Sequence, residues 1–412
     1  MIDVRLAREQ PEATRAALAR KGAADLFDQL MAADQQWRAE TSAVDALRAR
    51  TKLKGRPTPE QLAELQQVKE QLKAAEAQLE GIERRRNELL SLVPNPPSPD
   101  VPDGTTDDDA VEMRRVGEPP SFSFPVRDHV ELGGFDLDRG ARLSGSRFAY
   151  RRGATALLEL AMYRFALDRL LAEGFEPLLP PVLVREEAMY GTGFLPNDEV
   201  NLYRVERDDL YLTGTSEVAL AGFHAGEILE GAELPLRYAG YSTCFRREAG
   251  AAGRDTRGVF RVHQFDKVEM FSYTTPDASA EEHERILAIE ESLVGELGLA
   301  YRVVLTAAGD LGPSAAKKYD IEAYIPSQSR YREITSCSNT TDYQARRLGI
   351  RWRDADRRLG TVHTLNGTAM TARWLIALME TYQDGGGEVA VPAVLRAFGA
   401  PERLPASKEP PT

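Results

Sequence analysis

The chain has few cysteines and histidines and no long apolar segment. It holds two cysteines, Cys244 and Cys337, and five histidines among 412 residues. Because the cysteines lack CxxC spacing, a disulfide framework and a cysteine-rich zinc site are both excluded. No run of about 18 apolar residues occurs, and the charged, amphipathic N-terminus has no apolar signal core. We therefore expect a soluble, cytoplasmic protein that does not span a membrane.

The acidic excess of the chain is unevenly distributed. The net charge is −12, which by itself argues against a nucleic-acid partner. Residues 1–92, however, carry 16 basic and 15 acidic side chains, against 36 and 49 in the rest of the chain. An RNA partner would therefore contact the N-terminal part first.

Two long helices are predicted between about residue 27 and residue 92. Apolar residues form one stripe on the first helix, interrupted by Glu40. In the second helix they recur at alternating spacings of three and four, the heptad seam of helices that wrap around each other. The seam residues are Leu30, Ala33, Trp37, Val44 and Leu47 in the first helix and Leu65, Val68, Leu72, Ala75, Leu79, Ile82 and Leu89 in the second.

The segment between these helices, Lys54 to Pro59, predicts a short reversal. Thr58 can cap the second helix, Pro59 suits its first position, and Gln61 completes a capping box. A short reversal makes the helices antiparallel. Some 30 residues at about 1.5 Å each give an arm of roughly 45 Å.

The tip of this predicted arm is basic, with five cations in nine residues. Basic clusters are most often only a solvated helix end. A lone helical hairpin that projects needs a functional reason, however, and phosphate binding at its tip supplies one. Both interpretations stay open at this point. The five cations are Arg48, Arg50, Lys52, Lys54 and Arg56.

A linker and a mixed core follow the helices. Residues 93–106 are too rich in Pro and Asp for helix or strand, and we place the linker at residues 93–114. Residues 115–412 mix helical stretches with β-branched and aromatic runs. These strand-like runs are more numerous than the regular strand–helix alternation of a doubly wound sheet would give. We therefore predict an α+β domain with a mainly antiparallel sheet flanked by helices. The strand-like runs include residues 211–220, 257–273 and 301–308.

Charged side chains concentrate between Cys244 and Met270. The residues from Phe260 to Met270 alternate apolar and polar as a strand does, and could present a cation, a ring and a carboxylate to one pocket. Arginine binds phosphate through paired donors, an aromatic face stacks on adenine, and a carboxylate accepts from ammonium or hydroxyl groups. A hairpin with a charged loop is the simpler alternative. The side chains concerned are Arg261, His263, Phe265 and Glu269.

Three shorter segments have a similar character. The runs Leu212–Glu217 and Glu333–Asn339 each place a carboxylate within three residues of hydroxyl groups, although Ser and Thr often serve only to cap turns. The third, Thr364–Thr368, is a polar turn that leads into an apolar helix with Arg373 near its start. A charge at the end of a buried helix needs a partner, and a triphosphate is a good candidate.

Together these segments resemble seryl-tRNA synthetases. Gly174–Pro181 looks like the first class II signature, which packs at the dimer interface, Arg246–Glu269 like the second and Asn366–Arg373 like the third. Thr215–Glu217 matches the Thr-x-Glu element of the family, and Glu333–Asn339 its Glu-x-x-Ser-Cys-Ser-Asn element. The resemblance covers nearly the whole chain, because this family also has an N-terminal two-helix arm.

The resemblance implies a fold and a reaction. Residues 115–412 would form a class II core of antiparallel strands and helices that works as a homodimer. Residues 1–92 would form a coiled-coil arm that grips the long variable arm of tRNA(Ser) with its basic tip. The chain would activate L-serine with ATP and Mg²⁺ and transfer it to the tRNA. An archaeal-type enzyme of this specificity binds zinc, but the scattered histidines here offer no zinc site.

On the ATP side, the resemblance implies three catalytic residues. Arg246 would bridge the α-phosphate and the serine carboxylate, and Arg373 would hold the γ-phosphate. Glu333, together with Ser336, would hold Mg²⁺ and the phosphates. Glu248 would accept from the adenine amino group. The other implied ATP contacts are Arg247, Val262, Phe265, which would stack on adenine, Ile334 and Thr335.

On the serine side, the resemblance implies a small polar pocket. Thr215 and Glu269 would bind the ammonium group, and Glu269 with Thr368 would recognise the hydroxyl. Buried acceptors that alanine or glycine leaves unpaired would provide selectivity for serine of roughly 10⁴-fold. The remaining pocket residues would be Ser216, Glu217 and Asn366.

Three alternatives share this resemblance. A homologue could activate serine and deliver it to an acceptor other than tRNA, with the same pocket and a different arm. A duplicate of the housekeeping enzyme could tolerate a serine-mimicking antibiotic. An inactive homologue acting as an RNA-binding regulator or scaffold would usually have lost pocket residues, which this chain retains.

Overall fold

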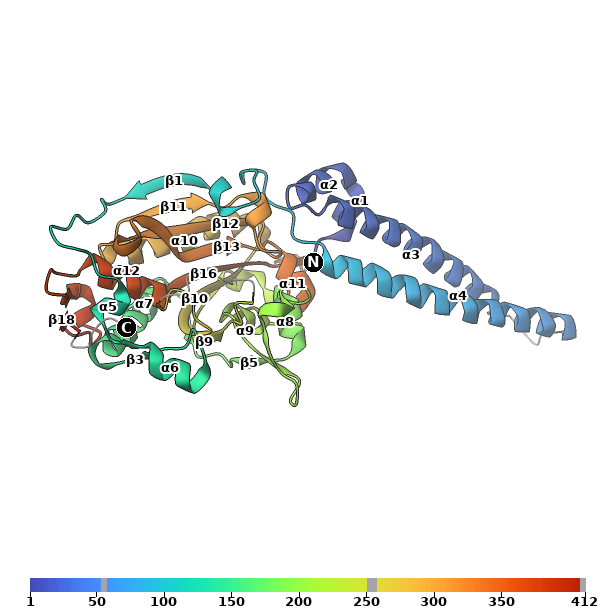
Figure 1. The fold of residues 1–412 in the computed structure, drawn as a ribbon. Coiled ribbons are helices and arrows are strands. Elements are labelled where there is room, and N and C mark those ends of the chain that lie inside the picture. Colours follow the sequence, from blue (N-terminus) through green and yellow to red (C-terminus); the bar gives the residue numbers. More distant parts are fainter. Residues whose placement is uncertain (53–57, 250–257, 408–412) are drawn as a thin grey trace. The chain divides into compact units, whose positions relative to one another are not determined.

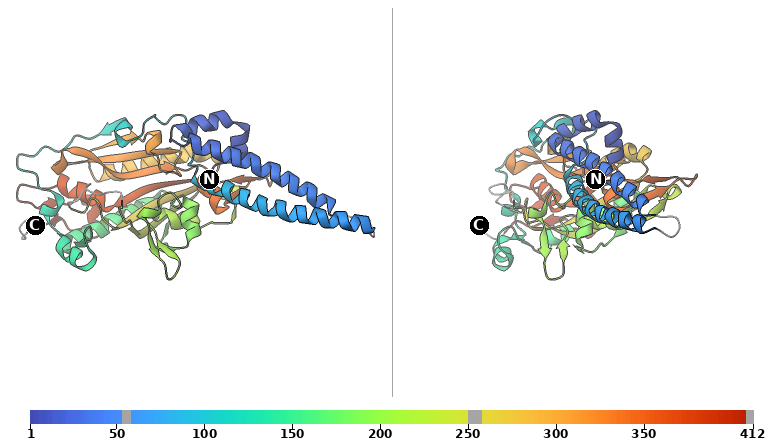
Figure 2. Two further views of the ribbon diagram at one scale, coloured as in Figure 1. Left: turned by 45° about the vertical axis from the view of Figure 1, so that its right-hand side comes forward. Right: turned by 90° about the vertical axis from the view of Figure 1, so that its right-hand side faces the viewer.

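The computed structural model describes residues 1–52, 58–249 and 258–407, which form two compact units, Met1–Pro96 and Pro97–Thr412. Figures 1 and 2 show the arrangement of elements inside each unit. Among the described residues, no helix combines the length and the apolar character needed to cross a membrane.

The first unit is helical, as predicted. Two short helices, α1 (Val4–Glu9) and α2 (Pro11–Ala19), precede the long helices α3 (Ala24–Arg50) and α4 (Pro59–Leu92). The long helices run side by side in opposite directions (Figures 1 and 2). Both halves of the predicted capping box are present at Thr58. The seam residues Leu30, Val44, Val68 and Leu89 are buried between the helices or at their base.

A buried carboxylate joins three helices of this unit. Asp34 on α3 is fully buried and accepts from Arg8 of α1 at 2.7 and 2.9 Å and from Arg86 of α4 at 2.8 Å. Arg38 lies 3.4 Å from the same carboxylate. The guanidinium of Arg86 also stacks over the ring of Trp37, 4.7 Å from its centroid. Because a buried charge needs partners, this cluster fixes α1 and α4 on α3.

An eight-stranded sheet forms the centre of the second unit. Its order is β1-β11-β12-β13-β16-β10-β9-β4, and every neighbouring pair is antiparallel except β4 with β9. The prediction of a mainly antiparallel sheet is therefore confirmed. The strands are β1 (Val111–Val116), β4 (Glu176–Leu178), β9 (Leu236–Phe245), β10 (Gln264–Thr274), β11 (Tyr301–Leu305), β12 (Lys317–Ile325), β13 (Arg330–Asn339) and β16 (His363–Thr371).

Smaller sheets lie beside the large one. The three-stranded sheets have the orders β5-β7-β6 and β15-β14-β8, and two further pairs are β2-β3 and β17-β18. Their strands are β2 (Phe135–Asp136), β3 (Tyr150–Arg151), β5 (Leu183–Val184), β6 (Tyr203–Val205), β7 (Leu210–Leu212), β8 (Ile228–Glu230), β14 (Arg351–Arg353), β15 (Leu359–Thr361), β17 (Val389–Ala390) and β18 (Arg403–Leu404).

Three long helices cover the sheet and bury its apolar side chains. They are α7 (Gly153–Ala172), α10 (Ser279–Glu296) and α12 (Ala372–Thr381). Trp374 of α12 is fully buried, and its Nε1–H donates to the carbonyl of Ile334 on β13 at 3.1 Å. The shorter helices are α5 (His129–Leu132), α6 (Leu137–Ser144), α8 (Glu186–Thr192), α9 (Glu217–Gly222), α11 (Tyr343–Leu348) and α13 (Ala393–Arg396).

The element predictions were wrong in two places. The strand-like run 211–220 ends at Leu212 and continues as helix α9 from Glu217. The strand β10 begins at Gln264, so Arg261 and His263 precede it. In addition, β1 pairs with β11 from Val111 onward, so the last residues of the predicted linker belong to the sheet.

Candidate active site

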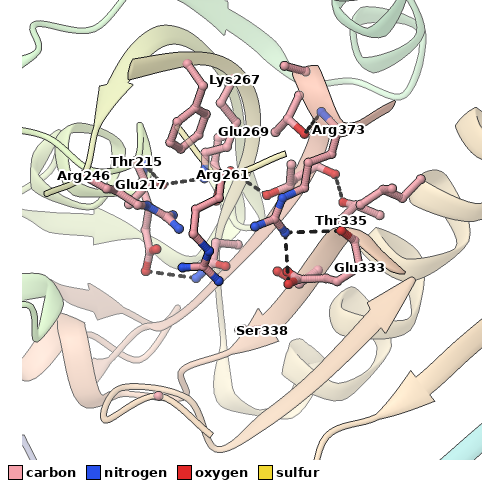
Figure 3. A pocket seen from close by; sticks show the side chains of 18 of the residues that line it. Thr215, Glu217, Arg246, Arg261, Lys267, Glu269, Glu333, Thr335, Ser338 and Arg373 are labelled. Carbon is pink, nitrogen blue, oxygen red and sulfur yellow. Dashed lines mark hydrogen bonds and ion pairs between the residues drawn. The ribbon is translucent and has the colours of Figure 1, made fainter. Parts of the chain in front are cut away.

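A polar cavity of about 360 Å³ opens over the middle of the large sheet (Figure 3). Strands β10, β12, β13 and β16, the start of α12 and the residues just after β9 contribute to its walls. Fifteen residues predicted from the sequence line it. They are Thr215, Glu217, Arg246, Glu248, Arg261, Val262, Phe265, Glu269, Glu333, Ile334, Thr335, Ser336, Asn366, Thr368 and Arg373.

Two irregularities of the sheet lie next to the cavity. The register between β10 and β16 shifts after Val268, so that Glu269 faces Thr368. The register between β12 and β13 shifts at Glu322, which faces Glu333. A bulge breaks the strict alternation of a strand and redirects side chains. The second bulge, between β12 and β13, therefore helps to bring successive residues of β13 to the cavity.

One end of the cavity is a buried charged cluster (Figure 3). Lys267 Nζ lies 2.5 Å from Glu269 Oε2 and donates to Thr215 Oγ1 at 2.6 Å. Thr368 Oγ1 donates to the same Glu269 oxygen at 3.3 Å. Burial raises the pKa of Glu269 to about 7, because lost hydration and the charge of Glu217 outweigh the ammonium of Lys267.

A second carboxylate stands beside this cluster. Glu217 Oε1 accepts from Gln344 Nε2 at 2.7 Å and from Asn366 Nδ2 at 3.0 Å. Burial raises the pKa of Glu217, although Lys267 and Gln344 act in the opposite direction. This end of the cavity therefore presents two carboxylates, a hydroxyl and an ammonium to a small polar ligand.

Arginines and an aromatic ring occupy the other end. Arg246 stacks over the ring of Phe265, 5.3 Å from its centroid, and its Nε–H donates to the carbonyl of Gly214 at 3.1 Å. Arg261 forms a close ion pair with Glu248. Guanidinium groups of this kind bind phosphate or carboxylate oxygens in pairs.

A third arginine lies on α12. Arg373 Nη1 donates to Glu333 Oε2 at 3.1 Å and to the Glu333 carbonyl at 3.2 Å, and its guanidinium stacks over Phe260. Although burial opposes ionisation, the charges of Arg373 and Lys318 lower the pKa of Glu333 to about 2. Glu333 is therefore an anion under all physiological conditions.

The two ends suit two different ligands. Anionic oxygens fit the arginines, a flat ring fits Phe265, and an amine with a hydroxyl fits the buried carboxylates. Because both ends belong to one cavity, a triphosphate nucleotide and a small amino acid can meet there.

Comparisons with known proteins identify the family of this chain. Residues 203–382 match the model of the tRNA synthetase class II core domain (G, H, P, S and T), and residues 1–97 that of the seryl-tRNA synthetase N-terminal domain. The serine–tRNA ligase of Clavibacter michiganensis subsp. michiganensis is 48% identical over 411 residues, covering 97% of this chain and 96% of that protein. The chain belongs to the seryl-tRNA synthetase family.

Solved structures agree with this membership. The seryl-tRNA synthetase from Pyrococcus horikoshii, complexed with ATP, superimposes with a TM-score of 0.94 at 40% identity, covering 99% of this chain and all of that one. The cytoplasmic serine–tRNA ligase from Naegleria fowleri, in complex with AMP, gives 0.88 at 32% identity, covering 97% and 96%. The class II synthetase fold of this seryl-tRNA synthetase family member, with its N-terminal helical arm, is thus as predicted.

Some predicted site residues point elsewhere in this synthetase. Ser216 is buried and shares a hydrogen bond of 2.8 Å with Ser242, outside the cavity wall. Arg247 stacks on Tyr203, and it does not line the cavity either. His263 was predicted to face the pocket, but its Nδ1 lies 2.9 Å from the carbonyl of Arg246. These side chains support the wall rather than face the cavity.

Sequence reasoning missed several wall residues. The most important is Lys267, which contacts both Thr215 and Glu269. A signal for it existed, since residues 265, 267 and 269 share one face of a strand. Phe260 and Lys318 had no comparable signal, because their approach to the cavity depends on the tertiary fold. Further wall residues without a sequence prediction are Phe194, Val259, Gly312, Ser314, Ala315, Ser338, Thr371 and Ala372.

Of the tip cations, Arg48, Arg50 and Lys52 lie in the described part of the arm. Arg48 Nη2 pairs with Glu76 at 2.9 Å, and Arg50 Nη2 with Glu64 at 3.3 Å, both between α3 and α4. All three side chains remain exposed. Lys54 and Arg56 lie outside the described residues.

Proposed function

We propose that this chain is a serine–tRNA ligase. It activates L-serine with ATP to seryl-adenylate and transfers the seryl group to the 3′ end of tRNA(Ser). The observation that carries the proposal is one cavity with arginines at one end and the buried Glu269, Lys267 and Thr215 cluster at the other. The curated relatives carry this activity in their names, and the P. horikoshii structure holds ATP.

ATP occupies the arginine end in this proposal. Arg246 bridges the α-phosphate and the serine carboxylate, and Arg373 binds the γ-phosphate. Glu248 accepts from the adenine amino group, and Phe265 stacks on the ring. Arg246 lies over one face of Phe265, 5.3 Å from its centroid. Val262, Ile334 and Thr335 complete this side, and Arg247 supports its wall through Tyr203.

Glu333 and Ser336 suit a magnesium ion. Both line the cavity, and a carboxylate with a pKa of about 2 and a hydroxyl are the hard oxygen donors that Mg²⁺ prefers. When bound, the ion would neutralise phosphate charge. The described residues hold no group of three or more His, Cys, Asp or Glu side chains suited to a metal, so the phosphates would complete the coordination.

Serine occupies the carboxylate end. Its ammonium group binds Thr215 and Glu269, and its hydroxyl binds Glu269 and Thr368. Glu217 and Asn366 shape the pocket, and Ser216 supports its wall through Ser242. Alanine and glycine leave the buried acceptors unpaired, which is the strongest available source of discrimination against them.

The chemistry then needs positioning and charge more than proton transfer. The serine carboxylate attacks the α-phosphorus in line, a new P–O bond forms, and pyrophosphate leaves. Arg246 and Arg373 neutralise the charge that develops on the phosphate oxygens. In the second step a ribose hydroxyl at the tRNA 3′ end takes the seryl group, and AMP leaves.

The remaining parts of the chain serve the tRNA and the partner subunit. Residues 1–92 form the tRNA-binding arm and 115–412 the catalytic domain. Residues 93–114 link them, and their last residues, from Val111, join the catalytic sheet as part of β1. The enzyme works as a homodimer in the cytoplasm. Exposed leucines on and near α7, where the first class II signature lies, support an interface there. They are Leu157, Leu160, Leu171 and Leu179.

Two assays on one preparation test the proposal. The first is serine-dependent ATP–pyrophosphate exchange, and the second is charging of total tRNA with labelled serine. We expect activity in both. Exchange without charging would point to a non-tRNA acceptor, and no exchange with serine would overturn the proposal. Unusual tolerance of a serine-mimicking inhibitor would mark a resistant duplicate.

A further inference from the structure

A buried histidine connects two walls of the ATP side. His129 lies on α5 and is 5% exposed. Its Nδ1 is 3.0 Å from Glu380 Oε1 on α12, and its Nε2 is 3.2 Å from the backbone nitrogen of Val259. The ring thus sits between the helix that carries Arg373 and a segment that lines the cavity.

These contacts fix the protonation of the ring. The amide of Val259 can only donate, so Nε2 of His129 must be the acceptor, and Nδ1–H donates to Glu380. Glu380 also accepts from the His129 amide at 3.1 Å and from the Ser327 amide at 3.0 Å. All four contacts are satisfied only when the histidine is neutral and held in one orientation.

The segment 258–260 contacts α12 in two ways, through His129 at Val259 and through Arg373 at Phe260. Arg373 and Glu380 are seven residues apart and therefore lie on the same face of the helix. Glu380 holds Val259 through His129, while Arg373 stacks on Phe260 with 5.0 Å to the ring centroid. Arg332 stacks on the same ring at 4.0 Å.

The packing around His129 leaves no room for adjustment. A Cβ atom on Gly258 would lie 2.3 Å from His129 Nε2, and Gly258 has a φ of +79°. Only glycine combines that backbone conformation with so close an approach. The position of the ring and the path of the segment are therefore set together.

We propose that His129 is a positioning residue for the nucleotide: it holds Val259 and Phe260 in place and thereby sets the orientation of Arg373. The proposal rests on the proposed function, in which Arg373 binds the γ-phosphate. It concerns the ATP side alone, because no hydrogen bond or ion pair among the described residues links His129 to the Glu269 cluster.

Two substitutions each remove one of the two hydrogen bonds of the His129 ring and keep the other. An asparagine amide occupies the place of Nδ1, so His129→Asn keeps a donor for Glu380 and loses the acceptor for Val259. A glutamine side chain reaches the place of Nε2, so His129→Gln keeps that acceptor and loses the donor to Glu380. The pair is therefore a matched test of the Val259 contact.

We expect His129→Asn to raise the KM for ATP in pyrophosphate exchange on the order of tenfold, since a buried amide loses its acceptor. His129→Gln should stay within about twofold of wild type by the same reasoning, and the KM for serine should not change in either variant. A merely structural role would lower the melting temperature and change both KM values together. Equal ATP KM values in both variants would overturn the proposal.

Hydrogen exchange at the Val259 amide gives a readout independent of activity. The amide should exchange faster in His129→Asn than in His129→Gln or wild type. If the wild-type protein shows no serine-dependent exchange of pyrophosphate, the proposed function fails, and this amide measurement still decides the role of His129. Identical protection in the two variants would refute the positioning contact.

Discussion

Lys267 and Glu269 set the chemistry of the serine end. A buried carboxylate tends to hold its proton, while an ammonium at 2.5 Å favours the charged form. The balance raises the pKa of Glu269 to about 7, which is close to neutral pH. Small changes around this pair should therefore have large effects on serine binding.

We predict that Glu269→Ala abolishes serine activation, because the ammonium and hydroxyl of serine both lose their acceptor. Glu281→Ala is a matched control, since Glu281 is an exposed residue of α10. ATP–pyrophosphate exchange with saturating ATP measures both. Unchanged exchange in Glu269→Ala would remove this residue from the site.

The pH dependence follows from the same group. Below its pKa Glu269 is neutral and cannot pair with ammonium, so kcat/KM for serine should fall as the pH drops below about 7. The limiting slope is roughly tenfold per pH unit, and it disappears above the pKa. A pH profile of pyrophosphate exchange with limiting serine measures it, with limiting ATP as the control.

Lys267→Met should move that profile. Loss of the ammonium removes the main group that lowers the pKa of Glu269, so the fall in kcat/KM should begin at a higher pH than in wild type. Methionine keeps much of the buried volume. A midpoint at the wild-type pH would show that Lys267 does not control the carboxyl group.

At the scale of elements, local patterns were predictable and tertiary ones were not. The helices, the heptad seam and the capping box at Thr58 depend on residues close in sequence, and the structure confirms them. The bulges at Glu269 and Glu333 depend on the partner strand. The same holds for His263, whose alternation with Arg261 predicted a strand that starts only at Gln264.

The buried cluster in the arm gives a prediction at this scale. Asp34→Ala leaves Arg8 and Arg86 without their shared anion and should destabilise the helical unit by about 3 kcal/mol or more. Asp28→Ala removes the half-exposed Arg15–Asp28 pair and should cost much less, because solvent screens an exposed ion pair. Hydrogen exchange of α3 amides in the full chain measures each loss. Equal effects would contradict the distinction.

At the scale of the whole molecule, the site gathers residues from distant parts of the sequence. Thr215, Arg246, Glu269, Glu333 and Arg373 come from five segments and line one cavity. The sequence could name these residues through their motifs. Their mutual distances depend on the strand order of the sheet, which places β13 and β10 on either side of β16 and has no local signature.

The arm and the catalytic unit should respond differently to charge. We predict that Arg48→Glu with Arg50→Glu raises the KM for tRNA and weakens its salt dependence, because phosphate contacts are lost. Pyrophosphate exchange should not change. Two charge reversals in the second unit, Arg357→Glu with Arg358→Glu, change the net charge by the same amount and serve as the control. A tRNA KM equal to that of wild type would remove the tip from tRNA binding.

Two cations of the cavity form ion pairs with carboxylates of the same cavity. Arg373 holds Glu333 at 3.1 Å, and Arg261 holds Glu248. In the proposed function, the γ-phosphate binds Arg373 in place of Glu333, and Glu333 and Glu248 are the carboxylates that hold Mg²⁺ and the adenine amino group. Nucleotide and metal should then strengthen each other's binding reciprocally. A simple anion would displace a carboxylate from its arginine but would offer that carboxylate no new partner. These two ion pairs therefore favour a ligand that carries phosphates and a base together.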